Sequence, residues 1–339
     1  MYKLFGILIL SALFTGILTV PFINLLYKLK FQNPKYKSKD ILGRKTLFAK
    51  LHGWKVGTPT GGGILIIIST FLFSAIFYAV TKFSINWTAI ILFFTLFSFG
   101  LLGLYDDIQK FFNLKRTGLW SLHFRYKFLI QWVLALLIGY LLYTKMNLHS
   151  IYIPIFNFQF SIFNFYPIFA ASVIVATSNA FNITDGLDGL STGLLLIALS
   201  AFWYLAGFSI HHGDIRLFIA VLIGALLPFL YFNIYPARLY LGDTGALAFG
   251  AMLGVITLMI DQTLVLPVIG GVFVAEAASS IIQVASFTFR KGKRVFLIAP
   301  LHHHFEAKGW DETKVTMRFW LAGVALAFIG LFIATFGRT

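Results

Sequence analysis

Residues 87–110 read WTAIILFFTLFSFGLLGLYDDIQK, and the first 19 of them carry no charged side chain. A helix needs about 20 mostly apolar residues to cross the roughly 30 Å hydrocarbon core of a bilayer. Two aspartates, Asp106 and Asp107, follow the apolar run directly, and Lys110 comes one helical turn later. The stretch therefore predicts a membrane span that ends in concentrated charge.

The whole chain shares this apolar character. Its 339 residues are 59% hydrophobic and 12% charged, whereas soluble domains carry roughly 25% charged residues. This composition excludes an ordinary soluble domain and an intrinsically disordered chain. The net charge of +15 raises nucleic-acid binding as an alternative, but the hydropathy argues for a basic membrane protein instead. With no cysteine, disulfides and thiolate metal sites are excluded.

Nine further apolar stretches are long enough to approach a span. We therefore predict an all-α, polytopic integral membrane protein with about ten transmembrane helices, built as one transmembrane domain over residues 1–339. The predicted spans are 4–26, 61–80, 87–105, 128–143, 166–181, 190–208, 215–232, 246–260, 264–287 and 320–336.

The basic residues orient these spans. The odd-numbered connections between spans hold 22 of the 27 Lys and Arg residues. Because cytoplasmic loops carry an excess of Lys and Arg, these connections are predicted to be cytoplasmic and both termini extracytoplasmic. The predicted cytoplasmic loops cover about 27–60, 106–127, 182–189, 233–245 and 288–319.

Carboxylates gather at the same predicted face. Five of them lie beside the ends of spans, in three separate connections: Asp106, Asp107, Asp185, Asp188 and Asp243. Any one of these could equally be a helix cap or a solvated loop residue. Five at one membrane face indicate a site, and a hard cation with few protein ligands, such as Mg²⁺, would suit their oxygen atoms.

Three other motifs lie at this face or within a span. The glycine-rich run at 55–63, KVGTPTGGG, could offer backbone N–H groups to phosphate, although its spacing is not that of a Walker A motif. The run PLHHHFE at 300–306 predicts a loop, because three consecutive histidines cannot all point the same way on a helix. Imidazole there would serve phosphate binding or proton transfer. Glu276, within the ninth predicted span, is an intramembrane acid whose partner the sequence does not identify.

In order along the chain, the motifs DDxxK at 106–110, NxxDGxDG at 182–189, GD at 242–243 and HHHFE at 302–306 resemble the polyprenyl-phosphate N-acetylhexosamine-1-phosphate transferase superfamily. The runs GTPT at 57–60 and PLHHHFE at 300–306 are similar to its phospho-N-acetylmuramoyl-pentapeptide transferase branch. The resemblance implies transfer of phospho-N-acetylmuramoyl-pentapeptide from its UDP-linked donor to undecaprenyl phosphate. The products would be lipid I and UMP, made for peptidoglycan at the cytoplasmic face of the bacterial plasma membrane.

The resemblance also implies roles for single residues. Asp243 would bind Mg²⁺, Asp106 would be the base that deprotonates the lipid phosphate, and Asp107 and Lys110 would position phosphates. The histidines His302, His303 and His304 would contact phosphate or sugar. The residues expected to bind substrate are Lys55, Thr58, Lys127, Asn182, Asp185, Gly186, Asp188, Asn233, Tyr240 and Gly242, with Asp188 near uracil and Tyr240 stacked on it.

The sequence leaves alternatives open. A covalent phospho-aspartate route competes with one-step transfer, and a sister enzyme acting on UDP-GlcNAc competes with the muramoyl enzyme. A transporter or lipid flippase is a more distant alternative, because transporters place polar sites near the midplane of the membrane. The expected partners are the nucleotide donor, undecaprenyl phosphate and the lipid bilayer, with no nucleic acid; a homodimer is compatible with the sequence.

Overall fold

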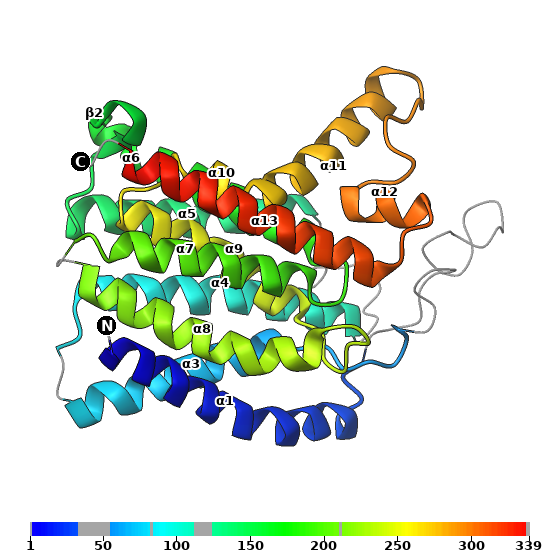
Figure 1. The fold of residues 1–339 in the computed structure, drawn as a ribbon, viewed down its shortest axis with the longest axis horizontal. Helices are drawn as coiled ribbons and strands as arrows, with labels where there is room; N and C mark the ends of the chain where they lie inside the picture. The colour runs from blue at the N-terminus through cyan, green and yellow to red at the C-terminus, as the bar shows by residue number, and fades with distance from the viewer. Residues whose placement is uncertain (1, 33–54, 82–83, 112–123, 210–211, 337–339) are drawn as a thin grey trace.

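The computed structural model describes residues 2–32, 55–81, 84–111, 124–209 and 212–336. Residues 33–54 and 112–123, which belong to the first two predicted cytoplasmic connections, lie outside the described residues. The described chain forms a bundle of long helices that run side by side (Figure 1). Nine of the described helices are long and apolar enough to cross a membrane: α1 (Tyr2–Lys28), α3 (Gly62–Thr81), α4 (Trp87–Phe111), α5 (Phe124–Lys145), α6 (Tyr166–Thr184), α8 (Gly213–Asn233), α9 (Gly242–Met259), α11 (Gly271–Phe289) and α13 (Glu312–Thr335).

The predicted all-α membrane fold is confirmed, with two differences of detail. The span predicted at 190–208 forms α7 (Leu190–Ala206), an apolar helix of 17 residues. The span predicted at 264–287 is wrong as one helix, because it breaks into α10 (Leu266–Ile269) and α11. Two adjacent glycines, Gly270 and Gly271, stand at the break, where their backbone freedom weakens helix continuation.

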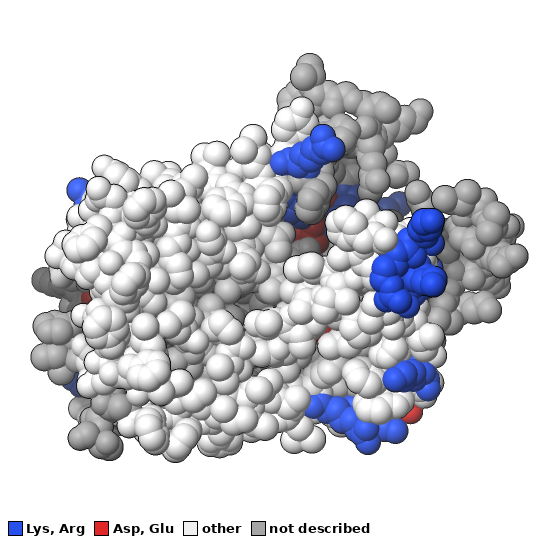
Figure 2. Space-filling view, turned by 90° about the horizontal axis from the view of Figure 1, so that it is seen from above, with Lys and Arg blue, Asp and Glu red and all other residues white. Residues whose placement is uncertain are grey.

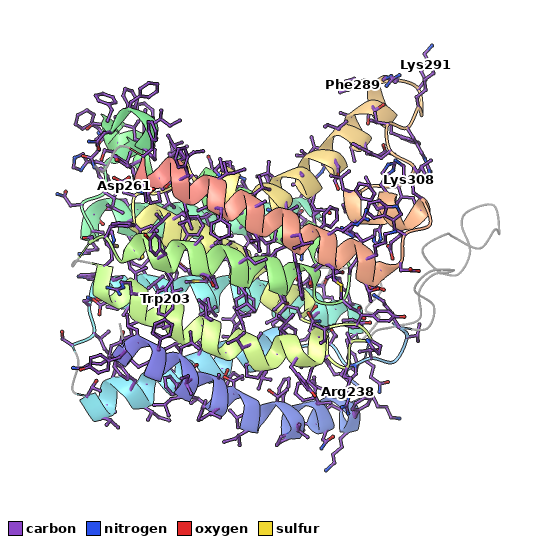
Figure 3. The ribbon with its side chains drawn as sticks, viewed as in Figure 1. Trp203, Arg238, Asp261, Phe289, Lys291 and Lys308 are labelled. Atoms are coloured by element: carbon purple, nitrogen blue, oxygen red, sulfur yellow. The ribbon has the colours of Figure 1, made fainter. Side chains whose placement is uncertain are left out.

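A small hairpin is the one sheet within the described residues. Strands β1 (Ser150–Ile153) and β2 (Phe158–Ser161) pair antiparallel, with 3-10 turns η2 (Pro154–Phe156) and η3 (Phe163–Phe165) beside them. The carboxylate of Asp261, just after α9, accepts hydrogen bonds from Tyr152 N at 3.3 Å and Gln159 Nε2 at 3.0 Å. The hairpin is thereby tied to the end of the bundle where Figure 3 labels Asp261.

Helix α9 forms the centre of the bundle. Every residue from Thr244 to Met259 is buried, and α4 and α6 both pack along it. At Gly103 of α4 a side-chain Cβ would lie only 2.1 Å from the Asp243 carbonyl oxygen. Small residues let helix backbones approach closely in membranes, so this contact brings the acidic end of α4 to the start of α9.

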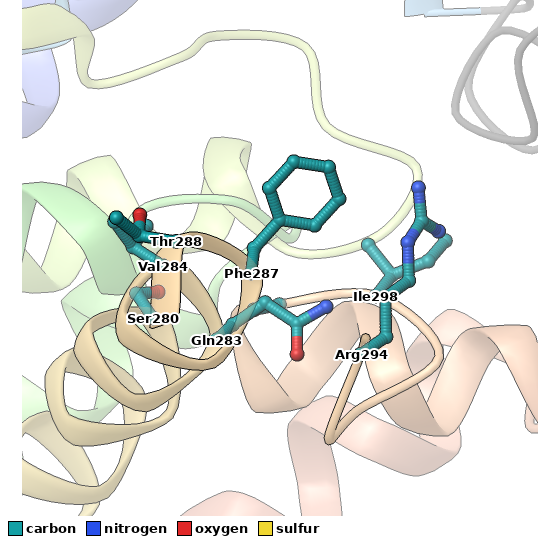
Figure 4. A pocket seen from close by; sticks show the side chains of 8 residues that line it. Ser280, Gln283, Val284, Phe287, Thr288, Arg294 and Ile298 are labelled. Atoms are coloured by element: carbon teal, nitrogen blue, oxygen red, sulfur yellow. The ribbon is translucent and has the colours of Figure 1, made fainter. Parts of the chain in front are cut away.

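Helix α11 leans away from the bundle, and the chain after it folds back along its side (Figure 1). Gln283 holds this returning segment, because its Oε1 accepts from Val295 N and Phe296 N and its Nε2 donates to the Phe296 carbonyl at 3.1 Å. A groove of about 400 Å³ lies between the helix and the segment, with Gln283, Phe287 and Arg294 in its lining (Figure 4). The position of the returning segment is therefore set by α11.

The returning segment leads into α12 (Leu301–Ala307), which contains all three consecutive histidines. The predicted loop at this motif is wrong. Successive helical residues point about 100° apart, so a short helix sends three neighbouring side chains in three directions without needing a loop.

The two ends of the bundle differ in charge. The start of α1 and the end of α13 lie at one end, away from α12 (Figure 1). Basic side chains gather at the other end, while the flank between the ends is almost free of charge (Figure 2). Arg238, Lys291 and Lys308 are labelled at this basic end in Figure 3. This separation supports the orientation predicted from the sequence, and which side of a membrane each end faces stays a prediction.

Candidate active site

Asp107 caps the first turn of α9. Its side chain is buried and accepts three hydrogen bonds, from Asp243 N at 2.9 Å, Thr244 N at 2.9 Å and Thr244 Oγ1 at 2.7 Å. Gly242 permits this approach, because its φ is +79° and a Cβ there would lie 2.7 Å from Asp107 Oδ2. A carboxylate satisfies the free N–H groups and the positive end of a helix N-terminus. Asp107 therefore fixes the position of Asp243.

Two carboxylates and two lysines alternate beside this cap. Lys127 Nζ lies 2.6 Å from Asp106 Oδ2 and 3.2 Å from Asp243 Oδ2. Lys110 Nζ lies 2.6 Å from Asp243 Oδ2 and 3.7 Å from Asp106 Oδ2. Asn182 Nδ2 donates to Asp243 Oδ1 at 3.5 Å. The last turn of α4, the first turns of α5 and α9 and the end of α6 thus converge on one charged cluster.

This cluster can be tested for its fit to Mg²⁺. Among the described residues no group of three or more His, Cys, Asp or Glu side chains could enclose a metal. Mg²⁺ usually takes one or two carboxylates and completes its shell with water and substrate phosphate. The Asp243 carboxylate, which lines the cavity, supplies such an oxygen donor, so the residues present fit the ion.

A second, buried charge cluster holds the chain after α6. Lys55 Nζ lies 2.6 Å from Asp188 Oδ1 and also contacts Glu312 Oε1. Asp188 Oδ2 accepts from Ala237 N at 2.9 Å, and Glu312 Oε1 accepts from Asp188 N at 2.8 Å. Burial lowers the pKa of the Lys55 ammonium, but the two carboxylates outweigh burial and raise it above its ordinary value. Lys55 is thus a permanent cation inside the protein.

Asp185 differs from the other acids because it has no lysine beside it among the contacts described. Burial raises the pKa of its carboxyl to about 7, although a 2.5 Å hydrogen bond donated by Ser191 Oγ opposes the rise. A carboxyl that titrates near neutrality can hold or release a proton under ordinary conditions.

These clusters surround a cavity of about 250 Å³ at the basic end of the bundle. Eleven predicted residues line it: Lys55, Asp107, Lys110, Asp185, Gly186, Asp188, Asn233, Tyr240, Gly242, Asp243 and His303. Figure 2 shows acidic side chains at the bottom of a hollow on this side of the molecule. The structure therefore brings together most of the residues that the motifs singled out.

Other predicted residues lie just outside the lining. Asp106, Lys127 and Asn182 join the site through their bonds to the Asp243 cluster. Thr58 donates its backbone N–H to the Lys55 carbonyl at 3.4 Å and is not among the lining residues. Asn233, which lines the cavity, bonds the Leu239 carbonyl at 2.9 Å and so also shapes the loop before Tyr240.

The glycine-rich run has a structural use. Gly61 N and Gly62 N donate to the Tyr240 carbonyl at 3.1 and 2.8 Å, and Gly63 N donates to the Leu241 carbonyl at 2.9 Å. These N–H groups join the start of α3 to the loop before α9 and are not left over for phosphate.

The three histidines of α12 take separate positions. His303 lines the cavity, and its Nδ1 lies 2.7 Å from Glu306 Oε2. His302 is fully buried behind the cavity. His304 lies outside, where its Nδ1 accepts from Leu297 N at 3.1 Å, and burial together with Lys308 lowers its pKa. Of the three, only His303 faces the space where a ligand would bind.

Sequence reasoning missed several residues at the site. Glu312 bonds both Lys55 and Asp188, while Gln32, Thr60, Phe111 and Leu187 line the cavity. From the sequence, Glu312 is one of the acids in the last predicted cytoplasmic loop, 288–319. Thr60 and Leu187 lie inside the quoted motifs GTPT and NxxDGxDG, although neither was singled out. Gln32 and Phe111 carry no local signal, because their place depends on the way distant segments pair, such as Gln32 with Pro59.

Known proteins of one family are similar to this chain over most of its length. Residues 88–261 match the model of the family described as glycosyl transferase family 4. A phospho-N-acetylmuramoyl-pentapeptide-transferase of Oceanobacillus iheyensis is 42% identical over 282 residues, covering 83% of this chain and 85% of its own length. Proteins of the same name from Rickettsia prowazekii and Desulfotalea psychrophila are 41% and 42% identical, each covering 83% of this chain and 80% of its own length. The chain therefore belongs to glycosyl transferase family 4 and, within it, to the phospho-N-acetylmuramoyl-pentapeptide transferases.

Proposed function

We propose that this chain transfers phospho-N-acetylmuramoyl-pentapeptide from its UDP-linked donor to undecaprenyl phosphate, releasing UMP and forming lipid I. The observation that carries the proposal is the Asp106–Lys127–Asp243–Lys110 cluster beside a cavity at one end of an apolar bundle. A polyanionic nucleotide needs cations, and a lipid phosphate on a prenyl tail needs a site at the membrane edge. The name of the relatives supports the same reaction.

The donor nucleotide binds in the cavity. Tyr240 lines it and offers an aromatic ring for uracil. Each carboxylate oxygen of Asp188 accepts one hydrogen bond, from Lys55 Nζ and from Ala237 N. Its role is to fix the backbone between Asp185 and Asp188, which forms one wall of the cavity.

The phosphates of the two substrates bind to Lys110 and Lys127. Asp243 would hold Mg²⁺, which when bound would neutralise diphosphate charge and stabilise the departing UMP. Asp106, whose side chain is 21% exposed, takes the proton from the lipid phosphate. An oxygen of that phosphate then attacks the donor phosphorus that bears the sugar, and the bond from this phosphorus to the UMP oxygen breaks. Asp107 takes no part in the proton transfer, because its carboxylate caps α9.

The acceptor approaches from the membrane. Because the donor is a cytosolic nucleotide and the basic end of the bundle carries the site (Figure 2), this end faces the cytoplasm and the protein lies in the bacterial plasma membrane. The acids gather at this end instead of at the midplane, which favours interfacial chemistry over transport.

The test measures UMP release by the purified chain in detergent with undecaprenyl phosphate and Mg²⁺. We expect release with UDP-N-acetylmuramoyl-pentapeptide and none with UDP-GlcNAc or without Mg²⁺. Asp243→Ala should reduce release to background, whereas Asp214→Asn should not, because Asp214 bonds Asn86 near the start of α8, away from the cluster. Release from UDP-GlcNAc would assign the sister activity, and no release from either donor would refute the proposal. Exchange of labelled UMP into the donor without any lipid acceptor would indicate the covalent route.

A further inference from the structure

Glu276 and His302 form a buried pair between α11 and α12. Both side chains are 0–1% exposed. Glu276 Oε1 accepts from His302 N at 3.1 Å, and Glu276 Oε2 lies 3.0 Å from His302 Nδ1. A charged side chain near the centre of a span costs about 2.5–3.5 kcal/mol on insertion scales. The two bonds to His302 therefore supply the partners that an acid in α11 requires.

The pair fixes the proton on one ring nitrogen. Carboxylate oxygens only accept hydrogen bonds, so the contact with Glu276 Oε2 places a proton on His302 Nδ1. Nε2 is buried without a hydrogen-bond partner among the described residues. It lies against Gly186, where a Cβ would be 2.3 Å from Nε2. Unprotonated Nε2 fits against the backbone at Gly186. A proton on Nε2 would be a buried hydrogen-bond donor that faces this backbone without an acceptor.

We propose that Glu276 and His302 are a positioning pair that sets the wall from Asp185 to Asp188 for nucleotide binding, an inference that rests on the proposed function of the cavity. The wall is supported on two sides. At one end Asp188 is held by Lys55 and Ala237 N, and at the other Gly186 lies on the imidazole ring of His302.

His302 acts through Gly186 and not by touching substrate. Its side chain is only 1% exposed, and it is not among the residues that line the cavity. The orientation of the ring depends in turn on α11, which also holds the segment before α12 through Gln283 and Ser286. A change at Glu276 is therefore expected to reach the cavity by way of His302 and Gly186, and to weaken nucleotide binding more than it slows the chemical step.

The first experiment compares Glu276→Gln and His302→Asn with a matched control, Ser279→Ala. Ser279 lies one turn along the same face of α11, is equally buried and bonds only the backbone of its own helix. UMP affinity by calorimetry and the KM and kcat for the donor are measured for each. Loss of a group that orients a metal-binding residue typically costs about 10- to 100-fold in affinity or activity, and we take the same range for the orienting pair here. We expect a weakening of UMP binding in this range and a matching rise in KM for both test variants, a smaller fall in kcat, and values within about twofold of the parent for the control.

A second pair of variants tests the contact with Gly186 directly. Gly186→Ala places a Cβ against His302 Nε2 and should weaken UMP binding. The double variant Gly186→Ala/His302→Asn should bind UMP more tightly than Gly186→Ala alone, because asparagine keeps a polar group near Nδ1 and lacks the outer half of the ring. This comparison tests the contact between His302 and Gly186 even if Glu276→Gln does not fold.

The proposal is overturned if the parent binds UMP and the variants at 276 and 302 match the control, if they lower kcat alone, or if the double variant shows no recovery. A parent chain that neither binds UMP nor releases it from the donor would instead refute the proposed function.

Discussion

Replacement of Asp107 by alanine tests whether this residue caps helix α9 or acts as a catalytic acid. The carboxylate accepts from Asp243 N, Thr244 N and Thr244 Oγ1, so the change leaves three donors without an acceptor. A hydrogen bond to a charged group contributes about 1.5–3 kcal/mol. Because water from the adjoining cavity can reach part of the gap, we expect the lower end of this range for each of the three bonds, a loss of about 4.5 kcal/mol in total.

That loss should appear as a lower melting temperature. For a chain of this size the entropy of unfolding converts about 4.5 kcal/mol into a fall in Tm of about 6 °C. Turnover should fall too, because the first turn of α9 carries Asp243. The matched variant Asp106→Ala should lose turnover with little change in Tm, because the Asp106 side chain is partly exposed and bonds lysines, not backbone. Thermal unfolding and UMP release are measured on both. An Asp107→Ala protein that keeps the parent Tm but loses all turnover would refute the cap.

Two further predictions follow from the buried charges. Lys55→Met leaves the buried carboxylates of Asp188 and Glu312 facing each other and should destabilise the protein by about 3–5 kcal/mol. The double variant Lys55→Met/Glu312→Gln should recover part of the lost Tm. An unchanged Tm in the single variant would contradict the buried ion pair. Asp185 has its pKa raised to about 7 in the fold from 3.8, so the folded state binds more protons than the unfolded chain between these values and stability falls as pH rises through this window. Melting curves from pH 4 to 8 should show this slope in the parent and a shallower slope in Asp185→Asn.

Much of the fold could be predicted because hydropathy is a local property. The apolar run 87–105 predicts a membrane span from its own residues, whatever the other segments do. Eight more spans can be predicted in the same way. The break at Gly270 escaped this reading because apolar residues continue on both sides of it. The hairpin at 150–161 is short, and it is held to the bundle by Asp261, about a hundred residues later, so hydropathy does not identify it.

The sequence predicted which residues gather at the site. The role of each residue depends on where its side chain points, which the sequence motifs do not show. Asp106 and Asp107 are adjacent, so on a helix their side chains point about 100° apart. One consequently meets Lys127 and the other meets the backbone of α9. The histidines of α12 follow the same rule, which is why His302 supports a wall while His303 lines the cavity. Motif spacing places such residues together and leaves open which of them a ligand can reach.

The difference between the two lysine clusters indicates how the site can exchange partners. Lys55 is 4% exposed at its side chain, and breaking a buried pair leaves an uncompensated charge, so this lysine keeps Asp188 and Glu312 whether or not nucleotide is bound. Lys110 is 55% exposed, and an exposed pair contributes only about 0–1 kcal/mol. Lys110 can therefore leave Asp243 for a substrate phosphate at little cost, and the same step removes one of the two lysines at Asp243 Oδ2 and makes room there for a cation. Phosphate binding and cation binding at this cluster should for that reason favour one another.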